Sequence, residues 1–202
     1  MSDATRVGTR AAGPGLPRWV DLILALGALA LAAPLLTIAA LAIKADSRGP
    51  IFYRQDRVGL RGTMFEMWKL RTMAHGAPLG GVWDPLLEDD ARVTRVGAFL
   101  RRTSLDELPN LLNVLRGEMA IVGPRPTISE QVAEYTPHQR RRLEVKPGLT
   151  GWAQVNGRAS LPWSERIELD VWYVDRRSWR LDARIMARTF RLLLSGRGLY
   201  ES

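Results

Sequence analysis

The sequence predicts a mostly helical α+β protein, in which an N-terminal re-entrant membrane hairpin of two helix segments precedes a compact globular domain. Three observations predict this fold class. An apolar run covers Val20–Ile43 and contains Pro34 near its middle. Two short segments of strand character flank a glycine turn, which predicts a small β-hairpin. The last segments of the chain combine apolar residues at helical spacing with arginine, which is typical of amphipathic interfacial helices.

The N-terminal part of the chain has two predicted segments. Residues 1–16 are polar and rich in glycine, alanine and proline, so we expect a disordered tail. The apolar run is long enough to cross a bilayer as one helix, about 36 Å against about 30 Å of hydrocarbon. Hydropathy alone favours such a span, because proline is tolerated in membrane helices. Basic residues on both flanks, such as Arg18 and Lys44, favour instead a re-entrant helix over residues 17–45, broken at Pro34, with both flanks in the cytoplasm.

Residues 46–202 have the composition of one soluble domain, which we expect to lie on the cytoplasmic membrane surface. Alternating apolar residues predict its strands, a period near 3.6 predicts its helices, and clusters of glycine and proline predict its loops. The predicted elements are strands at Ile51–Gln55 and Thr63–Lys69 around a turn at Gly59–Gly62, a loop at Ala74–Asp90, helices at Arg92–Arg102 and Ser104–Arg116, an irregular segment at Ile121–Pro126, helices at Ile128–Tyr135 and His138–Leu143, a glycine-rich loop at Lys146–Arg158, and helices at Ser164–Val174 and Asp182–Leu194.

The composition limits the chemistry that this chain can perform. It has 202 residues, no cysteine, and His75 and His138 as its two histidines. Disulfides, thiolate metal sites and cysteine nucleophiles are therefore excluded, and a site with several histidine ligands is disfavoured. The net charge of +8 favours anionic partners: phosphorylated substrates, nucleic acid or a membrane surface. An enzyme of this composition would use carboxylates, hydroxyls or cations.

Two adjacent carboxylates, Asp106 and Glu107, stand at the start of a predicted helix in the segment SLDELPNLLNVLRG. Ser104 and Glu107 match a capping box, in which the serine caps the Glu107 amide and the glutamate reaches back. Asp106 is then an anion favoured by the helix dipole. Alternatively, the helix N-terminus keeps a nucleophilic carboxylate ionised and gathers anions or their metal ions. Both interpretations hold together if Glu107 serves the cap and Asp106 attacks.

Basic and polar residues in the surrounding segments indicate a phosphorylated substrate. Arg101 lies about one turn before the carboxylates, and Arg125 stands between two prolines, which can aim its guanidinium at a phosphate. Lys69 ends the second predicted strand. A solvated surface position is the alternative for each of them. The segment GWAQVNGR offers hydrogen-bonding groups for a base or a sugar, namely Gln154, Asn156 and Arg158, and a turn with exposed amides is the alternative.

The segments SLDELPNLLNVLRGEMAIVGPRP and VKPGLTGWAQVNGR together resemble the bacterial sugar transferases, the monotopic polyprenol-phosphate phosphoglycosyl transferases. The resemblance runs from about Leu16 to the end of the chain and is to the small catalytic form. It implies transfer of a phosphosugar from a nucleotide diphosphosugar, usually a UDP-sugar, to a polyprenol phosphate, with release of UMP. It further implies Mg²⁺, a covalent aspartyl-phosphosugar intermediate on Asp106 with Glu107 as its partner at the metal, and a location at the cytoplasmic face of a bacterial inner membrane.

The resemblance also assigns further positions. Lys69, Arg101 and Arg125 align with basic positions of the family, and Asp170 and Asp182 with acidic ones that we group with the nucleotide- or sugar-binding residues. The family has Ser-Pro where this chain has Ala33-Pro34, so the expected helix break rests on the proline.

Two other functions stay open from the sequence. A membrane-anchored basic module without enzymatic activity could bind anionic lipid or nucleic acid, although it leaves the acidic pair and GWAQVNGR unexplained. A hydrolase could send the acyl phosphate to water. The sugar, the polyprenol length and the oligomeric state, including a homodimer, are also open.

Overall fold

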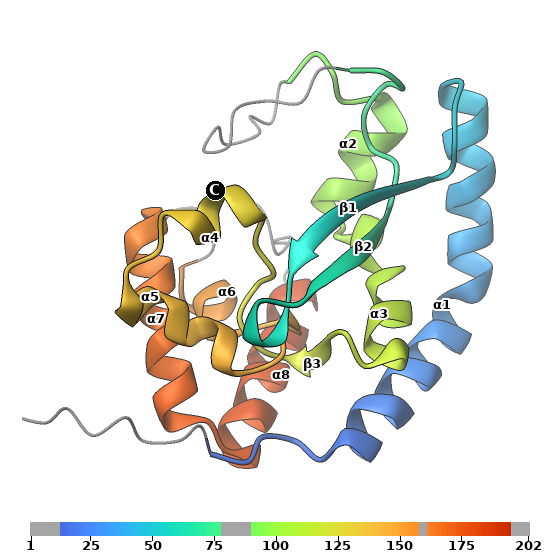
Figure 1. Ribbon diagram of the computed structural model, residues 1–202. Helices are drawn as coiled ribbons and strands as arrows, with labels where there is room; N and C mark the ends of the chain where they lie inside the picture. The colour runs from blue at the N-terminus through green and yellow to red at the C-terminus, as the bar shows by residue number, and fades with distance from the viewer. Residues whose placement is uncertain (1–12, 78–89, 158–160, 195–202) are drawn as a thin grey trace, which may run out of the picture.

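The computed structural model describes residues 13–77, 90–157 and 161–194 (Figure 1). Within these ranges the protein is mostly helical and has two small two-stranded sheets, which confirms the mostly helical α+β part of the predicted fold class. Figure 1 shows the β1–β2 hairpin between two groups of helices, with α1, α2 and α3 on one side and α4, α5, α6 and α7 on the other. Residues 1–12 of the predicted tail, and most of the predicted loop at Ala74–Asp90, lie outside the described residues.

The apolar run forms one helix, α1, over Arg18–Asp46, with Pro34 inside it. It is long and apolar enough to cross a membrane by length and composition. Figure 1 shows that α1 bends in its middle and continues in a new direction. The predicted break into two helices is therefore a bend within one helix. A proline removes one hydrogen bond and crowds the preceding turn, which kinks a helix without ending it when the turns on both sides stay bonded.

Both halves of α1 pack against the globular domain. Ala25 and Leu29 join the main hydrophobic core, while Leu36, Ala39 and Ile43 join a second cluster formed with α2 and the end of β2. The opposite face of α1 carries exposed leucine and isoleucine side chains, among them Leu31, Ile38 and Leu41. The helix is thus fixed along the side of the domain over its whole length.

Polar contacts tie both ends of α1 to the same domain. At the start, Arg18 donates to the Val114 carbonyl, with 2.5 Å between Nη2 and the oxygen. Close by, the buried Asp21 carboxylate accepts the amide of Ile121 at 3.0 Å. At the end, the buried Arg71 guanidinium donates to the carbonyls of Ile43 and Ser47 and so caps the last turn of α1.

The predicted hairpin is confirmed. Strand β1, Phe52–Val58, pairs antiparallel with β2, Met64–Leu70, and the 3₁₀ turn η1, Leu60–Gly62, joins them. Its register places Tyr53 opposite Lys69. Side chains alternate along a strand, so Lys69 leaves β2 on the same face as the buried Phe65 and Met67.

A second sheet brings together two segments far apart in the sequence. Strand β3, Ala120–Val122, pairs parallel with β4, Gly148–Thr150, and helix α6, Trp152–Asn156, follows. The irregular segment predicted from Ile121 and the loop predicted over Lys146–Arg158 are therefore partly wrong. Glycines lower local strand and helix propensity, but long-range pairing with the buried β3 overrides them here.

Most of the other predicted helices are present, with shifted bounds. The helix predicted over Ser104–Arg116 is the exception, because it divides at Pro109 into a 3₁₀ turn and a shorter helix. The observed elements are α2 (Arg95–Arg102), η2 (Leu105–Glu107), α3 (Asn110–Arg116), α4 (Ser129–Ala133), α5 (Pro137–Arg140), η3 (Arg141–Glu144), α7 (Trp163–Arg176) and α8 (Trp179–Leu194).

Candidate active site

The two adjacent carboxylates lie in η2, the tight turn between α2 and α3. Ser104, directly before it, has a left-handed backbone with φ 57° and ψ 18°. A non-glycine residue seldom adopts this conformation, and such strained positions cluster at functional sites. The turn buries both side chains, leaving Asp106 7% and Glu107 5% exposed.

Glu107 binds two cations from other segments. Its Oε1 lies 2.6 Å from Lys69 Nζ at the end of β2 and 3.0 Å from Arg125 Nη2 in the GPRP segment. The capping box predicted between Ser104 and Glu107 is therefore wrong: Ser104 makes no capping hydrogen bond, and the glutamate carboxylate turns to Lys69 and Arg125. Charge-assisted hydrogen bonds to two cations are stronger than one bond to a backbone amide.

These cations keep Glu107 ionised. Burial alone would raise the pKa of this carboxyl, but the charges and hydrogen bonds of Arg125 and Lys69 outweigh it and hold the pKa well below its usual range. Glu107 is therefore a fixed negative charge between two positive ones.

Asp106 has a different environment. Burial raises the pKa of Asp106 to about 6, and the negative charge of Glu107 adds to this, while Lys69, Arg125 and Arg101 oppose it. Its Oδ1 atom is buried and has no hydrogen-bond partner among the described residues. A buried carboxylate oxygen without a partner is costly unless something else engages it. Asp106 thus has an oxygen available for a ligand.

Arg101 completes the charged surroundings. It comes from α2, where its Nε donates to the Thr72 hydroxyl at 3.0 Å, and its charge interacts with Asp106. The structure therefore brings together Asp106, Glu107 and the three cations that the sequence indicated for phosphate binding.

The pair fits a divalent cation in part. The described part of the chain contains no group of three or more His, Cys, Asp or Glu side chains that could hold a metal. Mg²⁺, however, is usually held by one or two carboxylates together with substrate phosphates and water. Asp106 fits this arrangement better than Glu107, because its Oδ1 has no protein partner whereas Glu107 already binds Lys69 and Arg125.

The GPRP segment is fixed through its backbone carbonyls. Prolines have no amide to donate, so carbonyls are the main backbone groups that can hold this segment. The carbonyls of Pro124, Arg125, Pro126 and the following Thr127 each accept a hydrogen bond from another part of the domain, which fixes the direction from which Arg125 approaches Glu107. The donors are the Gly148 amide to Pro124 (2.9 Å), Arg142 to Arg125 (2.8 Å), Arg57 to Pro126 (3.4 Å) and the Val58 amide to Thr127 (2.8 Å).

The structure places the residues predicted to bind the nucleotide or sugar outside the direct contacts of the carboxylate pair. None of the four described ones forms a hydrogen bond or ion pair with Asp106 or Glu107, and the fifth, Arg158, is outside the described residues. The observed partners are the Leu149 carbonyl for Gln154 (3.2 Å), Arg188 for Asn156 (2.7 Å), Arg142 for Asp170 (2.5 Å), and the Leu16 amide (2.8 Å) and Tyr173 hydroxyl (2.7 Å) for Asp182.

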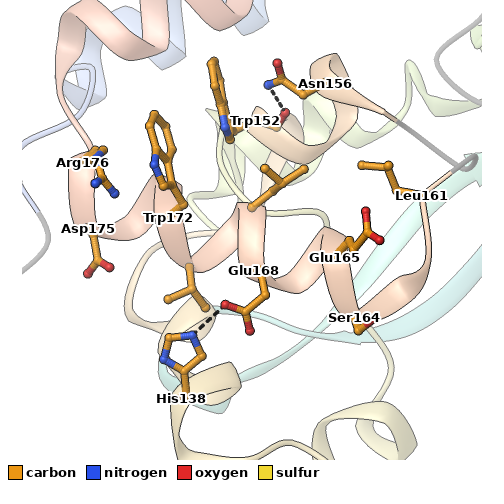
Figure 2. A pocket seen from close by; sticks show the side chains of 12 residues that line it. His138, Trp152, Asn156, Leu161, Ser164, Glu165, Glu168, Trp172, Asp175 and Arg176 are labelled. Carbon is orange, nitrogen blue, oxygen red and sulfur yellow. Dashed lines mark hydrogen bonds and ion pairs between the residues drawn. The ribbon is translucent and has the colours of Figure 1, made fainter.

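Asn156 lines a separate pocket on the outer face of α7, with a volume of about 760 Å³ (Figure 2). Trp152 and Trp172 stack along it with 4.8 Å between ring centroids, and Arg188 and Arg176 cover their outer faces. Neither carboxylate of η2 lines this pocket, so it is distinct from the site.

Two arginines near the site were not identified from the sequence. Arg142 is 6% exposed and donates to the Arg125 carbonyl. Burial lowers the pKa of Arg166, and the charges of Arg125 and Arg142 lower it further. Its Nε is buried without a partner within the described chain. The spacing of Arg166 and Asp170, one turn apart on one helix face, was the available signal.

Comparison with known proteins gives consistent results. The family model of the bacterial sugar transferases matches residues 14–196. The sugar transferase EpsL of Bacillus subtilis (strain 168) is 46% identical over 168 residues, 83% of this chain and 81% of that protein. The UDP-glucose:undecaprenyl-phosphate glucose-1-phosphate transferase of Xanthomonas campestris pv. campestris is 45% identical over 84% of this chain and 37% of its own length. The transferase of the same name from Caulobacter vibrioides is 44% identical over 91% of this chain and 71% of its own length.

The family match covers helix α1, the carboxylate pair and both motif segments, including the GPRP loop that carries Arg125. The chain belongs to the bacterial sugar transferase family, and is therefore an enzyme of that class.

Proposed function

We propose that this protein transfers a phosphosugar from a UDP-sugar to a membrane polyprenol phosphate and releases UMP. The observation that carries the proposal is the buried Asp106–Glu107 pair among Lys69, Arg101 and Arg125. The relatives named as UDP-glucose:undecaprenyl-phosphate glucose-1-phosphate transferases support this substrate class. The reaction would be the first membrane step in assembling a glycoconjugate or polysaccharide.

Asp106 is the proposed nucleophile. In the first step a carboxylate oxygen of Asp106 attacks the phosphorus that carries the sugar, and a new oxygen–phosphorus bond forms. The bond from this phosphorus to the oxygen bridging the two phosphates breaks, and its electron pair leaves with UMP. In the second step an oxygen of the polyprenol phosphate attacks the same phosphorus, and the electron pair of the acyl phosphate bond returns to Asp106.

The cations make such an attack possible. A diphosphate repels a carboxylate nucleophile, so its charge must be neutralised in a site that excludes water. Lys69 and Arg125 are held in place by Glu107, and Arg101 by Thr72, so all three are oriented before substrate binds. Mg²⁺, held mainly by Asp106 of the carboxylate pair together with the phosphates, would add further charge neutralisation.

We further propose that α1 is a re-entrant anchor and that residues 46–202 lie on the cytoplasmic face of a bacterial inner membrane. Both ends of α1 are bound to one polar domain, through Asp21 at the start and Arg71 at the end. A helix that crossed the bilayer would separate these ends by the membrane thickness and draw the domain into hydrocarbon. The exposed apolar face of α1, with Leu31, Ile38 and Leu41, supports shallow insertion.

The topology can be tested with single cysteines, because the chain has none of its own. We expect Pro14→Cys and Arg48→Cys, on either side of α1, to react with a membrane-impermeant thiol reagent from the same side, in inverted vesicles. Labelling from opposite sides would establish a spanning helix instead.

The activity can be tested by UMP release from a panel of UDP-sugars in the presence of polyprenol phosphate. We expect Asp106→Asn to lower the rate by at least about 1000-fold, since it removes the nucleophile. Asp175→Asn, which alters a carboxylate paired with Arg141, is the control and should keep its activity. Normal activity of folded Asp106→Asn would overturn the proposal, and UMP release that needs no polyprenol phosphate in multiple turnovers would indicate a hydrolase.

A further inference from the structure

Arg142 is a buried charge with three separate hydrogen-bond partners. Its guanidinium donates to the Asp170 carboxylate on α7 at 2.5 Å, to the Tyr135 hydroxyl at 2.7 Å, and to the backbone carbonyl of Arg125 at 2.8 Å. Arg142 and Asp170 are 6% and 3% exposed. Arginine is seldom buried to this degree, so its partners indicate what it does.

The contact with the Arg125 carbonyl is the one that reaches the site. Arg125 stands between Pro124 and Pro126, which have no amides, so its own carbonyl is a principal point at which its backbone can be held. The Arg125 side chain leaves this backbone toward Glu107, with 3.0 Å between Nη2 and Oε1. Moving the carbonyl would therefore move the guanidinium.

Stability alone does not explain the buried pair. Burial raises the pKa of Asp170 to about 6, even though Arg142 opposes this with its charge and hydrogen bond. The ionised pair thus stabilises the folded domain less than the short distance between Arg142 and Asp170 would suggest. Apolar residues of similar size can often replace such buried pairs without loss of stability. A costly ion pair is expected where it fixes a geometry, and the geometry fixed here is that of the Arg125 backbone.

We propose that Arg142, oriented by Asp170, is a positioning residue that sets the direction of the Arg125 guanidinium at the carboxylate pair. Arg142 does not touch the substrate; it acts through Arg125. A planar guanidinium can bond Asp170, Tyr135 and the Arg125 carbonyl at once, whereas a lysine ammonium at this place cannot reproduce the fork. The inference rests on the proposed role of Arg125 in phosphate transfer.

A double-mutant cycle in the full-length membrane-bound enzyme tests this inference. The variants are Arg142→Lys, Arg125→Lys and the double variant, with the single-turnover rate of UMP release and the KM for UDP-sugar as readouts. We expect Arg142→Lys to lower the rate about 10- to 100-fold, as misplacing a positioned group does, with a smaller change in KM. In the Arg125→Lys background, Arg142→Lys should lower the rate by less than about 3-fold, because the guanidinium that Arg142 positions is already replaced.

A neighbouring arginine provides the matched control. Arg141 also forms a close ion pair, with 2.5 Å between its Nη2 and Asp175, but within the described residues it forms no hydrogen bond or ion pair with the GPRP segment. Arg141→Lys should leave the rate unchanged in both backgrounds. Asp170→Asn gives an independent variant, expected to lower the rate in the same direction and to lose its effect in the Arg125→Lys background.

The outcomes separate this inference from the proposed function. Equal losses from Arg142→Lys with and without Arg125→Lys would show that Arg142 acts on the whole domain, and would overturn the inference. If Arg125→Lys itself has no effect on UMP release, the proposed phosphate-binding role of Arg125 fails instead. If Arg142→Lys does not fold, the Asp170→Asn cycle decides between the same outcomes.

Discussion

Two regions of this protein bury carboxylates among cations, and they differ in what holds the acid. At the start of α1, Asp21 accepts the backbone amide of Ile121, and nearby Asp182 accepts the amide of Leu16. In η2, Glu107 binds the side chains of Lys69 and Arg125, and Asp106 has an oxygen with no hydrogen-bond partner among the described residues. Burial is similar in both regions.

We interpret this difference as one between a structural role and a chemical one. A carboxylate that accepts a backbone amide is tied to the scaffold and cannot change its partner without moving the chain. Carboxylates held by long basic side chains can share those cations with an incoming phosphate. Burial and nearby charge alone therefore do not distinguish these two regions, whereas the type of partner does.

After the loss of the nucleophile in Asp106→Asn, the largest effect should come from Glu107→Gln, which keeps the size of the side chain and removes its charge. Lys69 and Arg125 would lose the anion that orients them, so we expect UMP release to fall about 100- to 1000-fold, the range for losing one preorganised electrostatic group. Initial rates at saturating UDP-sugar measure this. A rate near that of the wild type would show that Glu107 has a structural role, like the one we assign to Asp21.

The pH dependence of unfolding should come next. The pKa of Asp170 is raised from 3.8 to about 6 in the folded state, so between these values the folded protein binds more protons than the unfolded one. Protonated Asp170 therefore adds up to about 3 kcal/mol to the free energy of unfolding at pH values below 3.8, and this contribution is lost as the pH rises through about 6. Asp170→Asn should remove this part of the pH dependence, measured as the difference from the wild type in urea unfolding. If Asp170→Asn has the same pH dependence of unfolding as the wild type, this prediction is wrong.

A smaller effect, on stability rather than rate, is expected for Asp21→Ala. The substitution leaves the Ile121 amide without its acceptor, which should lower the free energy of unfolding by about 2 kcal/mol. The rate of UMP release per folded molecule should stay within about 2-fold, because the proposed reaction uses Asp106 and Glu107 whereas Asp21 holds the backbone of Ile121. A large loss of rate at unchanged stability would remove the distinction between the two regions.

Local signals sufficed for much of the fold. The glycine turn and the alternating residues on its two sides predicted the β1–β2 hairpin, and helical periodicity predicted α2, α7 and α8. The short strand β4 and helix α6 were missed, because the pairing with β3 that stabilises them joins segments far apart in the sequence.

The candidate site shows the same limit. The sequence indicated the cations that surround Asp106 and Glu107, but it paired Glu107 with Ser104, the nearest polar partner in the chain. Its actual partners, Lys69 and Arg125, are 38 and 18 residues away. Arg142 was missed for the same reason, since its contact with the Arg125 carbonyl has no sequence signature.

The smallest expected effect concerns backbone strain, and it distinguishes the site turn from an ordinary turn. Ser104, before η2, and Arg61, in the exposed hairpin turn, are the non-glycine residues with positive φ in the described ranges, at 57° and 54°. Glycine adopts this conformation without steric cost, so Ser104→Gly and Arg61→Gly should each change the free energy of unfolding by about 0.5 kcal/mol toward greater stability.

The two glycine variants should differ in activity. Arg61→Gly relaxes a turn that holds no functional group, and we expect its rate of UMP release to equal that of the wild type. Ser104→Gly gives freedom to the residue directly before Leu105, where the chain turns to present Asp106, and we expect a loss of about 3- to 10-fold from poorer positioning. Urea unfolding and single-turnover rates, measured on both variants, provide the comparison. Equal rates would show that the left-handed backbone at Ser104 only closes the turn, whereas a loss confined to Ser104→Gly would show that its rigidity serves the carboxylates.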